Sequence, residues 1–250
     1  RSDHLAAPPL APLDEVGELY GALVLATRDY VRKSGFTDVC LGLSGGVDSA
    51  LVATVAADAL GPDRVHAVLM PSRHSSEHSV SDAEDLVSRQ GLDDLTLPIE
   101  EVHQAVGRVL ANAPEGEPVG LTDENLQSRI RGVLLMARAN ANGWLVLSTG
   151  NKSESAVGYT TLYGDTAGAF AVIKDVTKTR VYELCRWRNA QSPGADGRAV
   201  VPEAILNKPP SAELRPGQRD DQSLPPYDVL DPVLEAYIEG NRTRSELVAD

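Results

Sequence analysis

The chain has 250 residues with a formal net charge of −13, so most of its surface repels polyanions and nucleic acid is not expected as the main partner. Hydrophobic residues make up 42% of the sequence, but no apolar run approaches the roughly 18 residues that span a bilayer, which argues against a membrane protein. Only two cysteines occur, which excludes a disulfide framework and a paired-cysteine metal site.

The first part of the chain predicts a linker, a helix and then a strand that turns into a second helix. Residues 1–13 lack a cationic region leading into an apolar one, so we interpret them as a linker and expect a cytoplasmic protein whose domain spans 14–250. Apolar residues at helical spacing predict a helix over 14–33. The apolar run 38–43 passes through glycines into a helical pattern, which predicts a strand, a tight loop and a helix.

Further along, buried-type strands alternate with helices. Strands are predicted over 64–70, 95–99 and 144–149, and helices over 77–89, after residue 99, and from a Thr122–Asp123 cap to about residue 140. Strands that alternate with helices imply right-handed crossovers. We therefore expect an α/β fold with an open parallel sheet covered by helices on both faces.

Two later segments show no clear period. Residues 151–170 are rich in glycine, threonine and serine, which favours a ligand-shaped loop over a strand. Residues 193–228 carry many prolines and glycines and predict a long irregular excursion, either ordered by a ligand or partner or partly mobile. The sequence stops inside a helical pattern, so we expect a truncated C-terminus.

A glycine-containing loop, Ser44-Gly45-Gly46-Val47-Asp48-Ser49, joins the first predicted strand to its helix. Backbone N–H groups at such a turn, together with the positive end of the helix dipole, bind an anion without a side-chain cation. A carboxylate beside phosphate is repulsive unless Mg²⁺ lies between them, and Mg²⁺ is commonly held by one or two carboxylates plus phosphate oxygens. The loop therefore predicts a site for Mg²⁺ and phosphate in which Asp48 is a metal ligand.

The string matches neither the Rossmann nor the Walker pattern. It resembles the motif of the PP-loop ATP pyrophosphatases, which implies an adenine nucleotide alpha hydrolase-like fold and cleavage of ATP between its α and β phosphates. Several enzymes share this loop, so the loop alone does not indicate the second substrate.

Other blocks of sequence resemble NAD synthetases, and most closely the synthetase domain of the glutamine-dependent form. These blocks are ENLQSRIRG at 124–132, STGNKSESAVGY at 148–159, TLYGD at 161–165, IKDVTKTRVYEL at 173–184 and KPPSAELRPGQRDDQSLPPYDVLD at 208–231. The resemblance implies ATP-dependent amidation of deamido-NAD to NAD through an acyl adenylate, with release of AMP and pyrophosphate and with Mg²⁺ as cofactor.

The same resemblance implies that ammonia comes from solution or from a glutaminase domain in the full-length protein, and that the chain forms a homodimer or a higher homo-oligomer. Two alternatives stay open at this point. One is another PP-loop enzyme, similar to GMP synthetase or to the tRNA-modifying enzymes, and the other is a nucleotide-binding domain without turnover.

The expected site residues combine this resemblance with local reasoning. For ATP they are Gly42, Leu43, Ser44, Gly45, Gly46, Val47, Asp48, Ser49, Thr149, Lys178 and Ser211. For deamido-NAD they are Asn125, Arg129, Arg131, Glu154, Tyr159, Thr160, Thr161 and Leu162.

Three of these residues also have a physical rationale. Thr149 ends a buried strand, where open parallel sheets bind ligands. Lys178 lies in the first turn of a predicted helix, where its charge opposes the helix dipole, so a purely structural role is disfavoured. Asp48 and Lys178 are the expected catalytic residues, and Asp48 and Glu154 the expected metal ligands. The alternative for Glu154 is an exposed helix cap.

Overall fold

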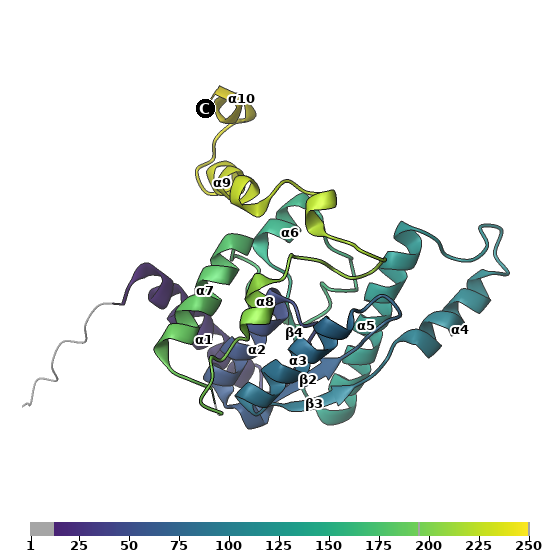
Figure 1. Cartoon of the computed structure of the whole chain (residues 1–250), viewed down its shortest axis with the longest axis horizontal. Helices are drawn as coiled ribbons and strands as arrows, with labels where there is room; N and C mark the ends of the chain where they lie inside the picture. The colour runs from purple at the N-terminus through teal and green to yellow at the C-terminus, as the bar shows by residue number, and fades with distance from the viewer. Residues whose placement is uncertain (1–12, 195, 250) are drawn as a thin grey trace, which may run out of the picture.

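The computed structural model describes residues 13–194 and 196–249 (Figure 1). Apart from Leu13, the linker predicted for residues 1–13 lies outside these described residues. The elements in chain order are α1 (Glu15–Lys33), β1 (Val39–Gly42), α2 (Val47–Leu60), the 3₁₀ turn η1 (Pro62–Arg64), β2 (Val65–Leu69), α3 (Glu77–Gln90), β3 (Asp93–Thr96), α4 (Glu100–Leu110), α5 (Leu121–Asn142), β4 (Leu145–Ser148), α6 (Lys152–Val157), β5 (Phe170–Ala171), α7 (Lys178–Gln191), α8 (Glu203–Asn207), the 3₁₀ turn η2 (Asp220–Gln222), α9 (Tyr227–Ile238) and α10 (Arg244–Ala249).

The five strands form one parallel sheet in the order β3-β2-β1-β4-β5. Val39 of β1 pairs with Val65 of β2 on one side and with Leu145 of β4 on the other. The chain thus runs outward in one direction from β1 through β2 and β3, and in the opposite direction through β4 and β5. Loops that leave β1 and β4 diverge at this switch point, which is where open α/β sheets bind ligands.

Helices cover both faces of the sheet, as the sequence predicts. Within β1, Val39 and Leu41 pack into one hydrophobic cluster and Cys40 into another, because successive side chains of a strand point to opposite faces. The first cluster includes residues of α2, α3 and α7, with α1 packed against α2 and α7 (Figure 1). The second is closed mainly by α5, through Ile130, Leu135 and Ala139.

Two predicted boundaries are wrong. The third strand runs over Asp93–Thr96 and not over residues 95–99, because pairing with β2 sets its register. This edge strand is exposed along its length, so the positions of apolar residues do not indicate where it begins and ends. The Thr122–Asp123 cap does not form. Helix α5 begins at Leu121 after Gly120, and the Asp123 carboxylate instead accepts hydrogen bonds from the side chains of His103 and Gln127.

The two segments without a clear period contain short regular elements. Residues 151–170 include the single-turn helix α6 and the start of the two-residue strand β5, so they are not entirely a loop. Residues 193–228 are mostly irregular, with α8, η2 and the first turn of α9 as exceptions. Within the described part of the chain, no helix is long and apolar enough to cross a membrane.

Candidate active site

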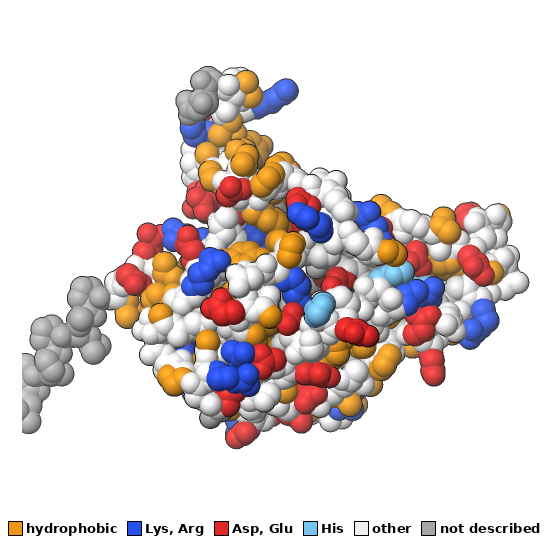
Figure 2. Space-filling view, in the orientation of Figure 1, with side chains coloured by type: hydrophobic (Ala, Val, Ile, Leu, Met, Phe, Trp, Pro, Cys, Tyr) orange, Lys and Arg blue, Asp and Glu red, His pale blue; other side chains and the backbone are white. Residues whose placement is uncertain are grey.

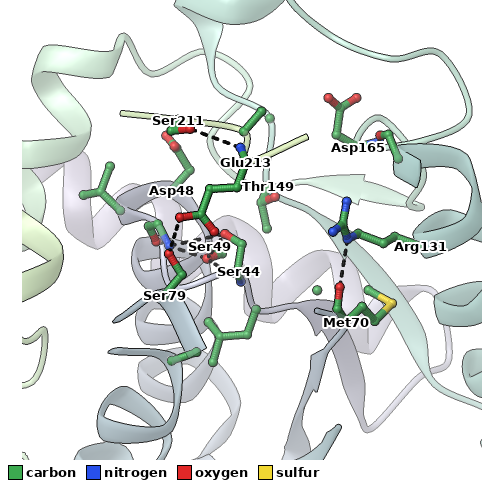
Figure 3. Close-up of a pocket in the computed structure, with 18 of the residues that line it drawn as sticks. Ser44, Asp48, Ser49, Met70, Ser79, Arg131, Thr149, Asp165, Ser211 and Glu213 are labelled. Atoms are coloured by element: carbon green, nitrogen blue, oxygen red, sulfur yellow. Dashed lines mark hydrogen bonds between the residues drawn. The ribbon is translucent and has the colours of Figure 1, made fainter. Parts of the chain in front are cut away.

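A cavity of about 270 Å³ opens where β1 and β4 end, at the switch point of the sheet (Figure 3). Many of the expected site residues line it. They are Gly42, Leu43, Ser44, Gly46, Val47, Asp48, Ser49, Arg131, Thr149, Glu154, Tyr159, Lys178 and Ser211. Fold topology therefore gathers residues from five separate blocks of the sequence around one cavity.

The glycine loop at 44–49 forms the floor of this cavity and ends in α2. Gly45 has a φ of +76°, and a Cβ added there would lie 2.1 Å from the Ser79 carbonyl oxygen, so a side chain is excluded. Among the described residues, no hydrogen-bond acceptor takes the amide N–H groups of Gly45, Val47, Asp48 and Ser49. These donors, together with the positive end of the helix dipole, are suited to bind an anion.

Lys178 supplies a side-chain cation beside the loop. Its Nζ lies 2.6 Å from Asp48 Oδ2 and 3.0 Å from Glu154 Oε1, and its side chain is 4% exposed. Asn151 fixes the arrangement from the end of β4, because its side chain caps α6 and also donates to Asp48 Oδ1 at 2.9 Å. The backbone N–H of Lys178 donates to Ser153 Oγ, which holds the start of α7 against α6.

The charges in this cluster are strongly coupled. Burial and the neighbouring charge of Asp48 raise the pKa of Glu154 to about 7, although Lys178 acts in the opposite direction. Burial disfavours the charged form of Lys178, but Asp48 and Glu154 outweigh it and hold the pKa of the ammonium well above its ordinary value. Two carboxylates therefore share one cation.

This donor set fits Mg²⁺ held jointly by protein and phosphate. The described residues contain no group of three or more acidic, histidine or cysteine side chains that could hold a metal alone. Mg²⁺ is usually bound by one or two carboxylates plus phosphate oxygens, and Asp48 with Glu154 provides two. Glu154 is not an exposed helix cap, since its side chain is 19% exposed and contacts Lys178.

The opposite wall is formed by residues 208–224, which we call the strap. Ser211 Oγ donates to the Gln218 carbonyl oxygen at 2.7 Å and so closes a turn within the strap. Glu213 has a φ of +49° and directs its carboxylate to the start of α3, where it accepts hydrogen bonds from Ser76 Oγ at 2.9 Å and Ser79 Oγ at 2.7 Å (Figure 3). Ser79 also lies against Gly45 of the glycine loop, so the strap is fastened to the same part of α3 that the loop contacts.

Arg131 is the one expected substrate residue of α5 that lines the cavity. Its Nε donates to the Met70 carbonyl oxygen at 2.9 Å, and burial lowers the pKa of the guanidinium to about 10. Because the side chain is fixed at the end of β2, its remaining N–H groups are available on the cavity side.

Other expected substrate residues do not line the cavity. Thr161 donates through Oγ1 to Asn125 Oδ1 at 2.9 Å, and Arg129 Nε donates to the Leu162 carbonyl oxygen at 3.1 Å. These four residues form a separate cluster where the loop after α6 meets α5, and Thr160 also does not line the cavity. Asp165 accepts from the Thr161 N–H at 2.8 Å, which orders this loop. Gly45 also does not line the cavity, because it faces α3.

Sequence reasoning missed three residues that shape the site: Asn151, Glu213 and Asp220. Asn151 lies between β4 and α6 and caps α6, so its capping role was detectable from the sequence, whereas its hydrogen bond to the distant Asp48 was not. Glu213 and Asp220 lie in the strap, which has no periodicity, and their partners are far away in sequence. No local signal indicates those contacts.

Fold and site together define a PP-loop nucleotide-binding protein, in which a glycine loop after the first strand and the charged cluster of Asp48, Glu154 and Lys178 adjoin one cavity. The family model described as NAD synthase matches residues 19–250, and the chain belongs to this family.

Individual relatives agree with this assignment. The chain is 52% identical over 246 residues to a glutamine-dependent NAD(+) synthetase of Rhodobacter capsulatus, an alignment that covers 96% of this chain and 44% of the relative. The chain thus spans less than half the length of such curated relatives.

Solved structures show the same fold. A glutamine-dependent NAD+ synthetase from Acinetobacter baumannii, in complex with ADP, superposes with a TM-score of 0.77 at 45% identity and covers 97% of this chain and 43% of that one. An NH3-dependent NAD synthetase from Campylobacter jejuni gives a TM-score of 0.73 at 28% identity and covers 94% of this chain and 91% of that one.

Proposed function

We propose that the chain catalyses ATP-dependent amidation of deamido-NAD to NAD, with release of AMP and pyrophosphate. The observation that carries this proposal is the glycine loop at 44–49, whose free amides lie beside Lys178, Asp48 and Glu154 in one cavity. Membership of the NAD synthase family supplies the substrate class.

In the first step a carboxylate oxygen of deamido-NAD attacks the α-phosphorus of ATP. The bond from that phosphorus to the bridging oxygen breaks, and pyrophosphate leaves with the electron pair. The loop amides and Lys178 bind the departing diphosphate and stabilise the charge that it gains. Asp48 and Glu154 would hold Mg²⁺, which would supply further positive charge at the phosphates.

In the second step ammonia attacks the acyl carbon of the adenylate. The bond from carbon to the AMP oxygen breaks, AMP leaves, and the nitrogen loses one proton to give the amide. The contribution of the enzyme is positioning, because two anionic nucleotides must be held with their reacting groups in contact. Arg131, fixed by Met70 at the rim, is suited to orient the deamido-NAD side.

The nitrogen source and assembly belong to the same proposal. Relatives of about twice this length are named glutamine-dependent, so we propose that a glutaminase domain delivers ammonia in the full-length protein. We also propose a homo-oligomer that covers the exposed apolar side chains of Val133, Met136, Leu162 and Tyr163 along α5 and its neighbouring loop. A solution mass measurement tests the second point.

The activity is tested with deamido-NAD, ATP, Mg²⁺ and ammonium chloride as substrates. We expect NAD, AMP and pyrophosphate in equal amounts, and transfer of ¹⁸O from a labelled nicotinate carboxylate to AMP. Formation of ADP and phosphate instead would contradict the adenylation chemistry. Turnover that requires RNA or a purine precursor would favour another PP-loop enzyme, and ATP binding without turnover would favour a regulatory domain.

A further inference from the structure

Helix α9 carries a buried carboxylate, Asp231, which is 1% exposed. Its Oδ1 accepts a hydrogen bond from Ser153 Oγ of α6 at 2.5 Å, and its Oδ2 accepts from the backbone N–H of Thr179 of α7 at 2.8 Å. A carboxylate buried this deeply is costly unless it is hydrogen-bonded. The contacts with α6 and α7 therefore account for its place in the fold.

The start of α7 lacks the negative charge that a helix dipole favours. The first turn of this helix contains no acidic residue, and its N-cap Thr177 makes no capping hydrogen bond through its side chain to the described residues. The first helical residue is instead Lys178, whose charge opposes the dipole. Asp231 supplies from another helix the charge and the acceptor that the sequence of α7 does not provide, so it acts as an N-cap of α7.

Ser153 connects Asp231 to Lys178. The serine hydroxyl has one hydrogen, which it donates to Asp231, and its oxygen accepts from the backbone N–H of Lys178 at 2.9 Å. Ser153 is itself fully buried. Asp231 thus fixes two consecutive amides at the start of α7, one directly at Thr179 and one through Ser153 at Lys178.

Other residues of α9 strengthen this attachment. Tyr227 precedes Asp231 by four residues and so lies on the same face of the helix, and its ring centroid is 5.4 Å from Lys178 Nζ, within reach of a cation–π contact. Glu239, which directly follows α9, pairs with Lys152 Nζ of α6 at 2.5 Å. Helix α9 is therefore attached to α6 and α7 near its start, in its middle and at its end.

We propose that Asp231 is a positioning residue for the phosphate-binding lysine. By fixing the start of α7, its carboxylate keeps Lys178 Nζ at 2.6 Å from Asp48 Oδ2, beside the glycine loop. Asp231 does not line the cavity, so it acts through α7 and not by contact with substrate. This inference rests on the proposed function, because it concerns the residue that binds the departing diphosphate.

Asp231→Asn tests the proposal, because it keeps the shape of the side chain and removes the charge and one acceptor. The amide oxygen can still accept from Thr179, but the NH₂ group then faces Ser153, whose hydroxyl proton loses its acceptor. We expect kcat for NAD formation to fall by about 10-fold, since a displaced Lys178 loses a charge-assisted hydrogen bond to the departing phosphates. The KM values for deamido-NAD and ammonium should not change.

Glu235→Gln is the matched control, because Glu235 is an exposed acidic residue one turn after Asp231 on α9. Its kcat should equal that of the parent chain. The melting temperature of each variant shows whether it folds. A lower melting temperature with an unchanged kcat in Asp231→Asn would make the carboxylate purely structural and would overturn the proposal.

A double-mutant cycle shows whether Asp231 acts through Lys178. The probe is inorganic pyrophosphate with Mg²⁺, and calorimetry measures its Kd for the parent chain, Asp231→Asn, Lys178→Met and the double variant. We expect Kd to rise by about 10-fold in Asp231→Asn and to be the same in the double variant as in Lys178→Met. Effects that multiply would make Asp231 independent of Lys178, which also overturns the proposal.

The pyrophosphate experiment separates this inference from the proposed function, because binding of pyrophosphate requires no amidation. If the cycle shows coupling but no NAD forms, the positioning role stands and the amidation fails. If NAD forms and the two effects multiply, the positioning role fails alone. A parent chain that does not bind pyrophosphate would contradict the phosphate site and this inference together.

Discussion

The glycine loop and the strap face each other across one cavity, but they are held in place by different kinds of contact. The loop at 44–49 is fixed locally, by the end of β1, the start of α2 and a glycine that meets the backbone of α3. The strap at 208–224 is fixed by single side chains that reach distant elements, such as Glu213 on Ser76 and Lys208 on Asp82. One wall depends on backbone shape, and the other on polar contacts that can break one at a time.

The largest effect is expected at Lys178, whose ammonium group lies between Asp48 of the glycine loop and Glu154 of α6. Lys178→Met leaves Asp48 and Glu154 buried without their cation, which should lower the free energy of unfolding by about 3 kcal/mol. It should also lower kcat/KM for NAD formation by about 100-fold or more, because a donor to the departing phosphates is lost. Urea unfolding and steady-state kinetics measure both effects.

Lys174→Met is the matched control, since Lys174 is exposed and four residues earlier in the chain. Equal behaviour of the two variants would show that Lys178 has no special role at the phosphates.

A nearly equal effect is expected from Gly45→Ala, which tests the backbone-shaped wall. The new methyl group would meet the Ser79 carbonyl, and the φ of +76° is unfavourable for alanine. We expect a loss of about 3 kcal/mol in the free energy of unfolding, from strain and overpacking together. The control Gly91→Ala has a φ of +67° but nothing within 4 Å, so it should cost only about 1 kcal/mol. Similar losses in both variants would mean that the contact with α3 is unimportant.

A smaller and more local effect is expected from Glu213→Gln, which tests the strap. The carboxylate accepts from two serine hydroxyls at the start of α3, where the helix dipole favours negative charge. Its loss should raise the rate of hydrogen exchange in residues 208–224 by about 10-fold and leave the loop at 44–49 and the global stability nearly unchanged. Glu203→Gln, at an exposed site just before the strap, should change neither. If exchange rises equally in loop and strap, the two walls are not independent.

The effect most restricted in its conditions is a pH dependence from Glu154, because it appears only over the range in which that carboxyl titrates. Its pKa of about 7 in the folded chain lies above the ordinary value of 4.5, so the folded state binds this proton more tightly than the unfolded state. The stabilisation is complete below pH 4.5, decreases as the pH rises and is lost above about pH 7. Glu154→Gln cannot titrate at this position, so its free energy of unfolding should lack this dependence on pH. Urea unfolding at several pH values would then show that the difference in free energy of unfolding between the variant and the parent chain changes between pH 4.5 and about pH 7. A constant difference would contradict the shifted pKa.

The comparison of loop and strap also shows how far the sequence predicts the structure. Alternation of strands and helices predicted the parallel sheet, because buried strands and amphipathic helices have local patterns. The position of Thr149 after β4 was predictable from the strand itself. Glu213 and Asp220 were not, because their partners at Ser76 and Tyr227 are specified by tertiary packing, and the strap has no period that would indicate which side chains point inward.

Boundaries failed where tertiary contacts compete with local signals. Thr122 and Asp123 have the composition of a helix cap, but the Asp123 carboxylate contacts His103 of α4 and Gln127 of α5 instead. In β3 the pairing with β2 overrides a weak apolar pattern. Such competition concerns single side chains. The predicted fold was therefore correct despite these boundary errors, whereas individual contacts in the site were not predicted.

The most direct test of the phosphate site is a crystal structure of the chain with Mg²⁺ and α,β-methylene-ATP, which cannot release pyrophosphate. We expect the β and γ phosphates on the amides of Gly45, Val47, Asp48 and Ser49, with Lys178 Nζ in contact and Mg²⁺ between the phosphates and the Asp48 and Glu154 carboxylates. Phosphates bound elsewhere in the cavity, with those amides left without an acceptor, would contradict it.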